Sequence, residues 1–151
     1  MLDIYDEFQQ LVEGLNERAI DYAVCGGMAM AFHGAPRATI AIDLLVLAKS
    51  LDEIIALAGE LGYTIRGKDL SFASGVIEIR RVSKIDRESG DLLSLDFLLV
   101  TPQIQQIWDT RLTSEWESRQ LSVVSREGLI ALKKLRGSGQ DLDDIEKLNN
   151  G

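Results

Sequence analysis

Apolar residues recur along this chain with two periods that follow one another. Between residues 4 and 18, Ile4, Phe8, Leu11 and Leu15 lie three or four residues apart, which predicts an amphipathic helix. Short apolar or β-branched runs, bounded by glycine and polar residues, are instead typical of strands. Runs of both kinds alternate to the end of the chain.

The two periods and the turn residues between them predict a series of elements. Helices are expected over residues 4–18, 28–34, 51–61, 102–110, 126–136 and 141–150. Strands are expected over residues 21–26, 39–48, 63–66, 76–83 and 92–100, with a hairpin over 115–125. Ser50 and Ser125 are placed to cap the helices that follow them, because a serine hydroxyl accepts hydrogen bonds from a first helical turn.

This order of elements indicates an α+β (mixed α/β) fold, in which helices flank a mixed β-sheet. The 151 residues fit one domain, and the chain shows no repeat, linker or low-complexity segment. We therefore expect residues 1–151 to form a single domain, with the C-terminal helices over residues 126–149 packed on it.

Composition narrows the class of protein and its partners. Apolar residues make up 46% of the chain and charged residues 26%, which is ordinary for a globular protein. The net charge of −8 disfavours the phosphate backbone of nucleic acids, so no DNA partner is expected and an RNA contact would need a local basic patch. The acidic N-terminus, the absence of a long apolar run and the lone Cys25 predict a cytoplasmic protein without a membrane partner.

Two predicted strands each carry one acid among apolar residues. Because side chains alternate along a strand, Ala41 and Asp43 share one face of theirs, and Ser94 and Asp96 share one face of the other. If the strands are neighbours, Asp43 and Asp96 converge, and two adjacent carboxylates need a proton or a cation between them. A divalent metal ion is the expected cation, and a backbone hydrogen bond to each acid is the alternative.

Three further features suit an anionic ligand. Gly26 and Gly27 lie between a strand and a helix, where backbone amides can hold phosphates. Lys133 falls on the inward apolar stripe of its helix, so it must either extend to solvent or meet an anion, phosphate or carboxylate. Arg37 lies in the loop after the second helix, where it either steadies a triphosphate or is solvated.

Together these motifs resemble the nucleotidyltransferase superfamily, the polymerase-β-like fold, and more closely its small bacterial AbiEii-like, toxin-type members. The resemblance is carried by "YAVCGGMAMAFHGAPRATIAIDLLV", "LSLDFLLV" and "VVSREGLIALKKLRGSGQDLDDIEKL" and covers about residues 20–148. It implies that Gly26 and Gly27 bind nucleotide phosphates and that Lys133 is the catalytic, nucleotide-binding lysine. It also implies catalytic, metal-binding roles for Asp43 and Asp96, the second acid of an Asp-x-Asp pair and the third acid of a site for two Mg²⁺ ions.

One position departs from the family pattern. The first acid of the Asp-x-Asp pair falls on Ala41, which cannot bind a metal ion. Two-metal transfer depends on bridging carboxylates, so the remaining acids are expected to hold a single Mg²⁺ and to support weak transfer or none. Glu78 is the alternative ligand, although an ion pair with Arg80 is the simpler reading of its side chain.

Three hypotheses therefore remain open from sequence. The chain is a Mg²⁺-dependent enzyme that moves a nucleoside monophosphate from an NTP to an RNA end, such as that of tRNA, or to a protein hydroxyl. Alternatively, it is a non-catalytic pseudo-transferase that binds a nucleotide or a partner, such as the antitoxin of a toxin–antitoxin pair. The third hypothesis is a structural interaction protein whose acids form buried ion pairs.

Overall fold

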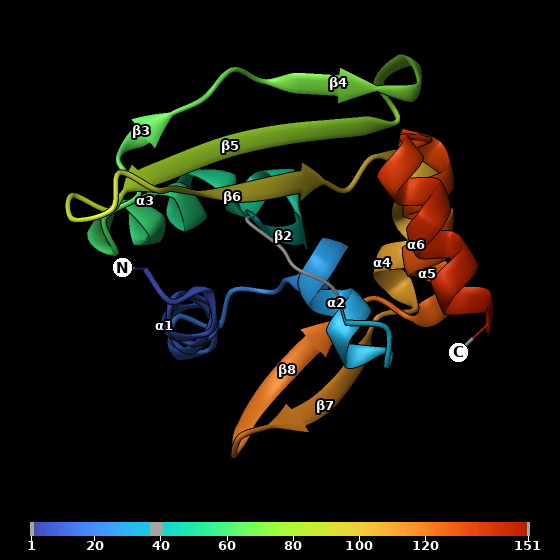
Figure 1. Ribbon diagram of the computed structural model, residues 1–151, viewed down its shortest axis with the longest axis horizontal. Coiled ribbons are helices and arrows are strands. Elements are labelled where there is room, and N and C mark those ends of the chain that lie inside the picture. Colours follow the sequence, from blue (N-terminus) through green and yellow to red (C-terminus); the bar gives the residue numbers. More distant parts are fainter. Residues whose placement is uncertain (1, 37–40, 151) are drawn as a thin grey trace.

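A mixed β-sheet is the centre of the molecule (Figure 1). The computed structural model describes residues 2–36 and 41–150. Within them, the strand order is β3-β5-β6-β2-β1-β8-β7, and β4 pairs with β5 as well. The strands are β1 (Ala23–Cys25), β2 (Ala41–Val46), β3 (Ile65–Arg66), β4 (Leu70–Phe72), β5 (Ile77–Ile85), β6 (Leu92–Leu99), β7 (Leu112–Trp116) and β8 (Arg119–Val123). The mixed sheet with flanking helices confirms the predicted α+β fold.

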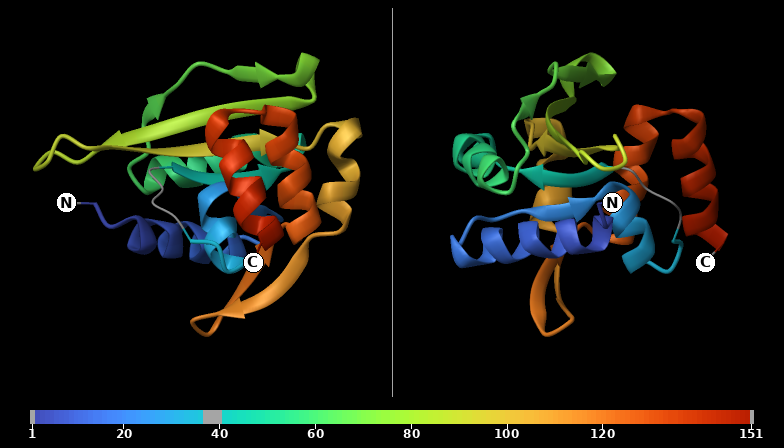
Figure 2. Two further views of the ribbon diagram at one scale, coloured as in Figure 1. Left: turned by 45° about the vertical axis from the view of Figure 1, so that its right-hand side comes forward. Right: turned by 60° about the vertical axis from the view of Figure 1, so that its left-hand side comes forward.

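Helices cover both faces of this sheet. They are α1 (Ile4–Glu17), α2 (Gly26–Phe32), α3 (Leu51–Glu60), α4 (Gln105–Asp109), α5 (Arg126–Arg136) and α6 (Gly139–Asn150), with 3-10 turns at Ala48–Ser50, Ala73–Gly75 and Pro102–Ile104. The right-hand view of Figure 2 shows α1 and α3 on one side of the sheet and α5 with α6 on the other. Among the described helices, none combines the length and the apolarity that a membrane span requires.

The two helices on the first face approach each other closely. A Cβ atom on Gly14 of α1 would lie 2.8 Å from Cδ1 of Leu57 in α3, so a larger residue here would require the Leu57 side chain to move. Asp3 starts α1 by accepting a hydrogen bond from the amide of Tyr5 at 2.9 Å. The cap at Asp3 and the close packing at Gly14 thus position α1 against α3 and the sheet.

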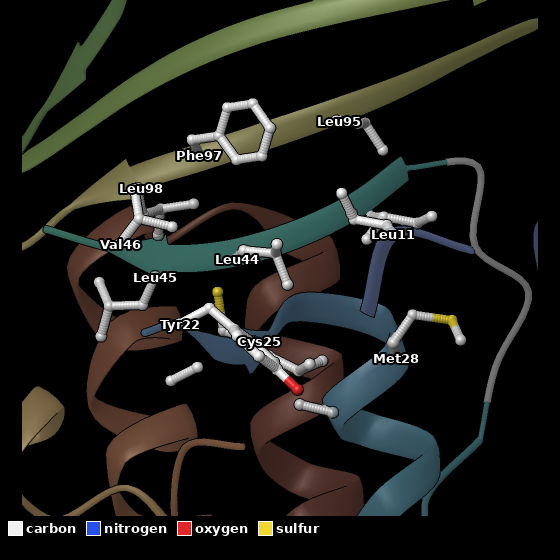
Figure 3. Close-up of a cluster of buried hydrophobic side chains, with 14 of the residues drawn as sticks. Leu11, Tyr22, Cys25, Met28, Leu44, Leu45, Val46, Leu95, Phe97 and Leu98 are labelled. Atoms are coloured by element: carbon white, nitrogen blue, oxygen red, sulfur yellow. The ribbon is translucent and has the colours of Figure 1, made fainter. Parts of the chain in front are cut away.

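The core between the sheet and these helices is apolar and fully enclosed (Figure 3). Leu44 of β2 and Phe97 of β6 are paired on neighbouring strands, and Leu11 of α1 lies in the same cluster; all three are fully buried. Each such side chain contributes about 1.5–3 kcal/mol relative to an exposed position. This layer fixes the face of β2 and β6 that points toward α1 and α3, and hence the opposite face, which carries Asp43 and Asp96, as well.

One buried polar group ties α1 to the sheet. The hydroxyl of Tyr63 donates a hydrogen bond of 2.8 Å to Oε1 of Glu7, and Lys84 forms an ion pair with the same carboxylate. The ammonium group of Lys84 also lies 4.7 Å from the centre of the Tyr63 ring. Burial and the Glu7 carboxylate raise the pKa of Tyr63 well above its ordinary value.

Most predicted elements are present, with local differences. The second helix begins at Gly26, two residues earlier than predicted, because both glycines take part in its first turn. Strand β4 was not predicted from its short apolar run. The Ser50 cap is wrong, since Ser50 ends a 3-10 turn and its side chain makes no capping bond. The Ser125 cap is confirmed: its Oγ accepts a hydrogen bond of 3.0 Å from the amide of Gly128.

Candidate functional site

Three adjacent strands bring the predicted acids to one face of the sheet. Strands β2 and β6 are parallel, with Asp43 opposite Asp96, and β5 runs antiparallel to β6 with Arg81 opposite Asp96. Residues paired across neighbouring strands point to the same face. The two acids are therefore neighbours, as the sequence predicted. The guanidinium group of Arg81, which was not predicted, lies on the same face beside Asp96.

Arg81 forms a bidentate ion pair with Asp96. Its Nε and Nη2 atoms donate hydrogen bonds of 2.6 and 2.9 Å to Oδ1 and Oδ2 of Asp96, so both carboxylate oxygens are engaged. The Asp96 side chain is 4% exposed, whereas that of Arg81 is 39% exposed and reaches solvent. The hydrogen bond to Asp96, with a smaller contribution from the charge of Asp43, raises the pKa of Arg81 above its ordinary value.

The next row of the same face holds no carboxylate. Ala41 lies opposite Ser94, and Ser94 lies opposite Ser83 on β5. The two serine hydroxyls are 2.8 Å apart and hydrogen-bonded to each other. Ala41 therefore replaces the family's first acid, and the residues beside it on this face, Ser94 and Ser83, are small and neutral.

These residues do not fit a pair of magnesium ions. Ala41 offers no ligand, and Asp96 already gives both oxygens to Arg81. Across residues 2–36 and 41–150, no group of three or more His, Cys, Asp or Glu side chains is arranged to hold a metal ion. Because divalent ions in such sites need bridging carboxylates, the donor set of this face is that of an ion pair.

Gly26 lets the chain pass directly beside Asp43. A Cβ atom at this position would lie 1.9 Å from Oδ2 of Asp43, and the backbone has a φ of +63°. Both observations require a glycine, because any side chain would overlap the carboxylate and strain the backbone. Gly27 follows in the first turn of α2 and is buried. The phosphate-binding role of these two glycines remains a prediction.

Lys133 points inward and meets carboxylates of α6. It is 4% exposed, and its Nζ atom lies 2.8 Å from Oδ2 of Asp144 and 3.7 Å from Oδ1 of Asp141. Gln140 donates a hydrogen bond of 2.9 Å to the other oxygen of Asp144. The inward direction predicted from the apolar stripe is confirmed, and the anion that the lysine meets in this structure is a pair of carboxylates.

A small hollow separates the sheet residues from the helical residues. It is bounded by Gly26 and Asp43 on one side and by Lys133, Arg136 and Asp141 on the other, and it measures about 20 Å³. This space has room for one water molecule and is too small for a nucleotide phosphate chain. A nucleotide would therefore have to bind at its rim or displace the side chain of Lys133.

Cys25 lines the same hollow at the end of β1. Burial raises the pKa of its thiol well above the ordinary value, and the negative charge of Asp43 adds to this shift. Lys133 and Arg136 act in the opposite direction, with a smaller effect. The thiol is therefore kept neutral and is a packed core group.

Two other predicted residues lie away from this cluster. Arg37 lies outside the described residues. Glu78 is on the opposite face of β5 from Arg81, because the two positions differ by an odd number of residues. Its carboxylate lies 3.6 Å from the guanidinium of Arg80, so the ion-pair reading is confirmed and Glu78 does not replace Ala41.

Sequence reasoning missed Arg81 and Arg136 and left Asp141 and Asp144 without a role. A signal for Arg81 was present: it and Asp96 are equally far from the middle of the polar loop that joins β5 to β6, which is where hairpin partners lie. The acids of α6 have the i, i+3 spacing that places both on one helical face.

Solved structures with the same arrangement of elements were found, although no protein-family profile and no curated protein matches the sequence. TM1012 of Thermotoga maritima, a candidate nucleotidyltransferase, superimposes with a TM-score of 0.67 over 97% of this chain and 92% of its own, at 13% identity. ANT(2″)-Ia, solved with adenylyl-2″-tobramycin, gives 0.63 over 95% and 86%, at 14% identity. The lincosamide antibiotic adenylyltransferase LnuA, with lincomycin bound, gives 0.56 over 95% of each chain, also at 14% identity.

These similarities extend over nearly the whole chain and include the sheet that carries Asp43 and Asp96. The protein therefore has the nucleotidyltransferase fold, as the sequence motifs suggested. At this level of identity the similarity concerns the fold, and the chemistry has to be argued from the side chains.

Proposed function

We propose that this protein is a nucleotide-binding member of the nucleotidyltransferase fold that has lost metal-dependent transfer. The observation that carries the proposal is the pairing of both Asp96 oxygens with Arg81, beside an alanine at position 41. A guanidinium group thus pairs with the acid that the resemblance assigns to a magnesium ion.

The physical argument concerns charge. In two-metal transfer, the ions neutralise the triphosphate and activate the attacking hydroxyl, and bridging carboxylates hold them. Here Arg81 already compensates Asp96, so this face attracts a divalent ion less than Asp43 and Asp96 would without the arginine. Mg²⁺ is then not a required cofactor of binding, and no group activates an acceptor hydroxyl.

Binding of an NTP is supported by the groups around the hollow. Gly26 lines the hollow at the start of α2, where helix amides can favour an anion, and the cations of Lys133 and Arg136 line it as well. Lys133 would exchange the carboxylates of α6 for phosphate oxygens. Such an exchange costs part of the binding energy, so we expect weak affinity.

A second candidate is a weak one-metal transferase. It is favoured by the register that places Asp43 beside Asp96, because one Mg²⁺ can be held by one or two carboxylates together with nucleotide phosphates. Such an enzyme would move a nucleoside monophosphate from an NTP to an RNA end or a protein hydroxyl in the cytoplasm. For either candidate, an antitoxin-like partner remains a prediction from the AbiEii-like resemblance.

The test places an acid at position 41 and removes the cation that pairs with Asp96. Four chains are compared: the wild type, Ala41→Asp, Arg81→Gln, and the double variant. Arg80→Gln serves as the matched control, because Arg80 lies next in sequence on the other face of β5 and pairs with Asp69 and Glu78. Calorimetry measures NTP binding with Mg²⁺ and with EDTA, and radiolabel transfer to tRNA and protein measures activity.

We expect the wild type and Arg80→Gln to bind NTP equally with Mg²⁺ and with EDTA, and to transfer nothing. The double variant should bind at least about tenfold more tightly with Mg²⁺, because position 41 then carries a carboxylate and Asp96 no longer pairs with Arg81. Transfer by the wild type would establish the second candidate in place of the first. Absence of NTP binding by all the chains would refute both.

A further inference from the structure

An apolar groove runs between α4 and α5, away from the candidate site. Figures 1 and 2 show the two helices side by side. Its floor includes Ile104, Ile107, Ala131 and Leu135, and its volume is about 740 Å³. The helices touch at Gly128, where a Cβ atom would lie 3.0 Å from Cγ2 of Ile107. Lys133 points from the other side of α5 into the hollow, so the groove and the candidate site are separate.

Two opposite charges flank this groove on one face of α5. Glu127 lies in the first turn and Lys134 in the last turn, and both are exposed. Neither side chain makes an ion pair or hydrogen bond within the part of the chain that the structure describes. They are seven residues apart, which is two helical turns or about 10.5 Å along the axis.

We propose that this groove is the interface of a homodimer in which α5 of one copy packs antiparallel to α5 of a second copy. A two-fold axis at the middle of α5 places Glu127 of each copy against Lys134 of the other, because a two-fold interface is self-complementary. The same pair of charges thus forms two ion pairs across the dimer.

Two features of the groove favour a second copy over another occupant. The charges are equal in number and opposite in sign, and the point midway between them falls between Ile130 and Ala131, of which Ala131 lines the groove. An alanine at the crossing point lets two helices approach closely. Ile107 and Leu135, both partly exposed in the single chain, then cover one another across the axis.

The test is a charge reversal and its rescue, followed by sedimentation equilibrium or by light scattering after gel filtration. Glu127→Lys and Lys134→Glu each replace two attractive contacts by two repulsive ones, and the double variant restores both attractions with the signs exchanged. Glu146→Lys and Lys147→Glu on α6 are matched controls, since both residues are exposed and lie away from the groove. Circular dichroism and thermal unfolding establish that every variant folds.

We expect a wild-type dimer with a dissociation constant in the micromolar range. Each single reversal should weaken it at least about tenfold, because both ion pairs of the dimer become repulsive contacts. The double variant should return to the wild-type constant, and both α6 controls should retain it. A wild type that stays monomeric at several hundred micromolar overturns the proposal, as does a dimer unaffected by the single reversals or not restored by the double one.

Discussion

Replacing Lys133 by methionine tests how strongly the C-terminal helices depend on one buried charge. The change removes the ammonium group but keeps a flexible apolar side chain of similar length. It leaves Asp144 and Asp141, whose side chains are 0% and 7% exposed, without the cation they share. Removing one partner of a buried ion pair leaves an uncompensated charge, which costs about 3–5 kcal/mol of unfolding free energy.

Burial decides the size of this effect. The Lys133 side chain is only 5% exposed and its Nζ atom lies 2.8 Å from Asp144, so solvent screens the pair little and the full range applies. For a domain of this size, 3–5 kcal/mol corresponds to a fall of about 6–20 °C in Tm. Urea unfolding followed by circular dichroism measures the free energy, and calorimetry measures Tm.

The chain supplies its own control one residue further on. Lys134 is exposed and makes no contact with an acid among the described residues, so Lys134→Met should cost about 0.5 kcal/mol or less. Lys133→Met combined with Asp144→Leu should recover at least half of the loss, since replacing both partners removes the buried charge. A cost below about 1 kcal/mol for Lys133→Met, or a double variant as unstable as the sum of its parts, would refute this reasoning.

Three further results are expected. Gly26→Ala should lower the free energy of unfolding by about 3 kcal/mol or more, because its Cβ overlaps Asp43 at a positive φ. Gly59→Ala, which has open space around its Cβ, should raise it by about 0.5–1 kcal/mol. Equal effects of the two changes in urea unfolding would contradict this reasoning. Labelling of Cys25 by a thiol reagent should be at least about a hundredfold slower in the folded protein than in urea, and prompt labelling would disprove its burial. Tyr63 stays protonated in the folded chain, whereas an unfolded tyrosine loses its proton above about pH 10. The free energy of unfolding should therefore fall as pH rises past that value, and it should fall less steeply in Tyr63→Phe. Equal slopes for the two chains in urea unfolding between pH 9 and pH 11 would contradict this prediction.

The periodicity of single strands and helices predicted the features of the site that depend on one strand or one helix alone. Strand alternation was enough to place Ala41 with Asp43 and Ser94 with Asp96, because side-chain direction in a strand has a period of two. The helical period was enough to turn Lys133 inward, since its position fell among apolar residues. In both cases the hydrophobic core fixes which face is buried.

The residues that change the chemistry depended on long-range pairing. Arg81 meets Asp96 only because β5 pairs antiparallel with β6 in one register, and a shift by one residue would have turned it to the other face. The partner of Lys133 depended on how α6 folds back on α5, and helix periodicity does not specify that packing. The expectation that Asp43 and Asp96 hold a single Mg²⁺ was formed without these partners, and it remains a prediction.

The account rests on Arg81 acting as the fixed cation of the site in place of magnesium. The most direct measurement is a pair of calorimetric titrations of the wild-type protein with ATP, one with Mg²⁺ and one with EDTA. We predict dissociation constants that agree within about twofold, since the charge of Asp96 is already compensated. Affinity at least about tenfold higher with Mg²⁺ would show that metal ions enter the site and would contradict the account.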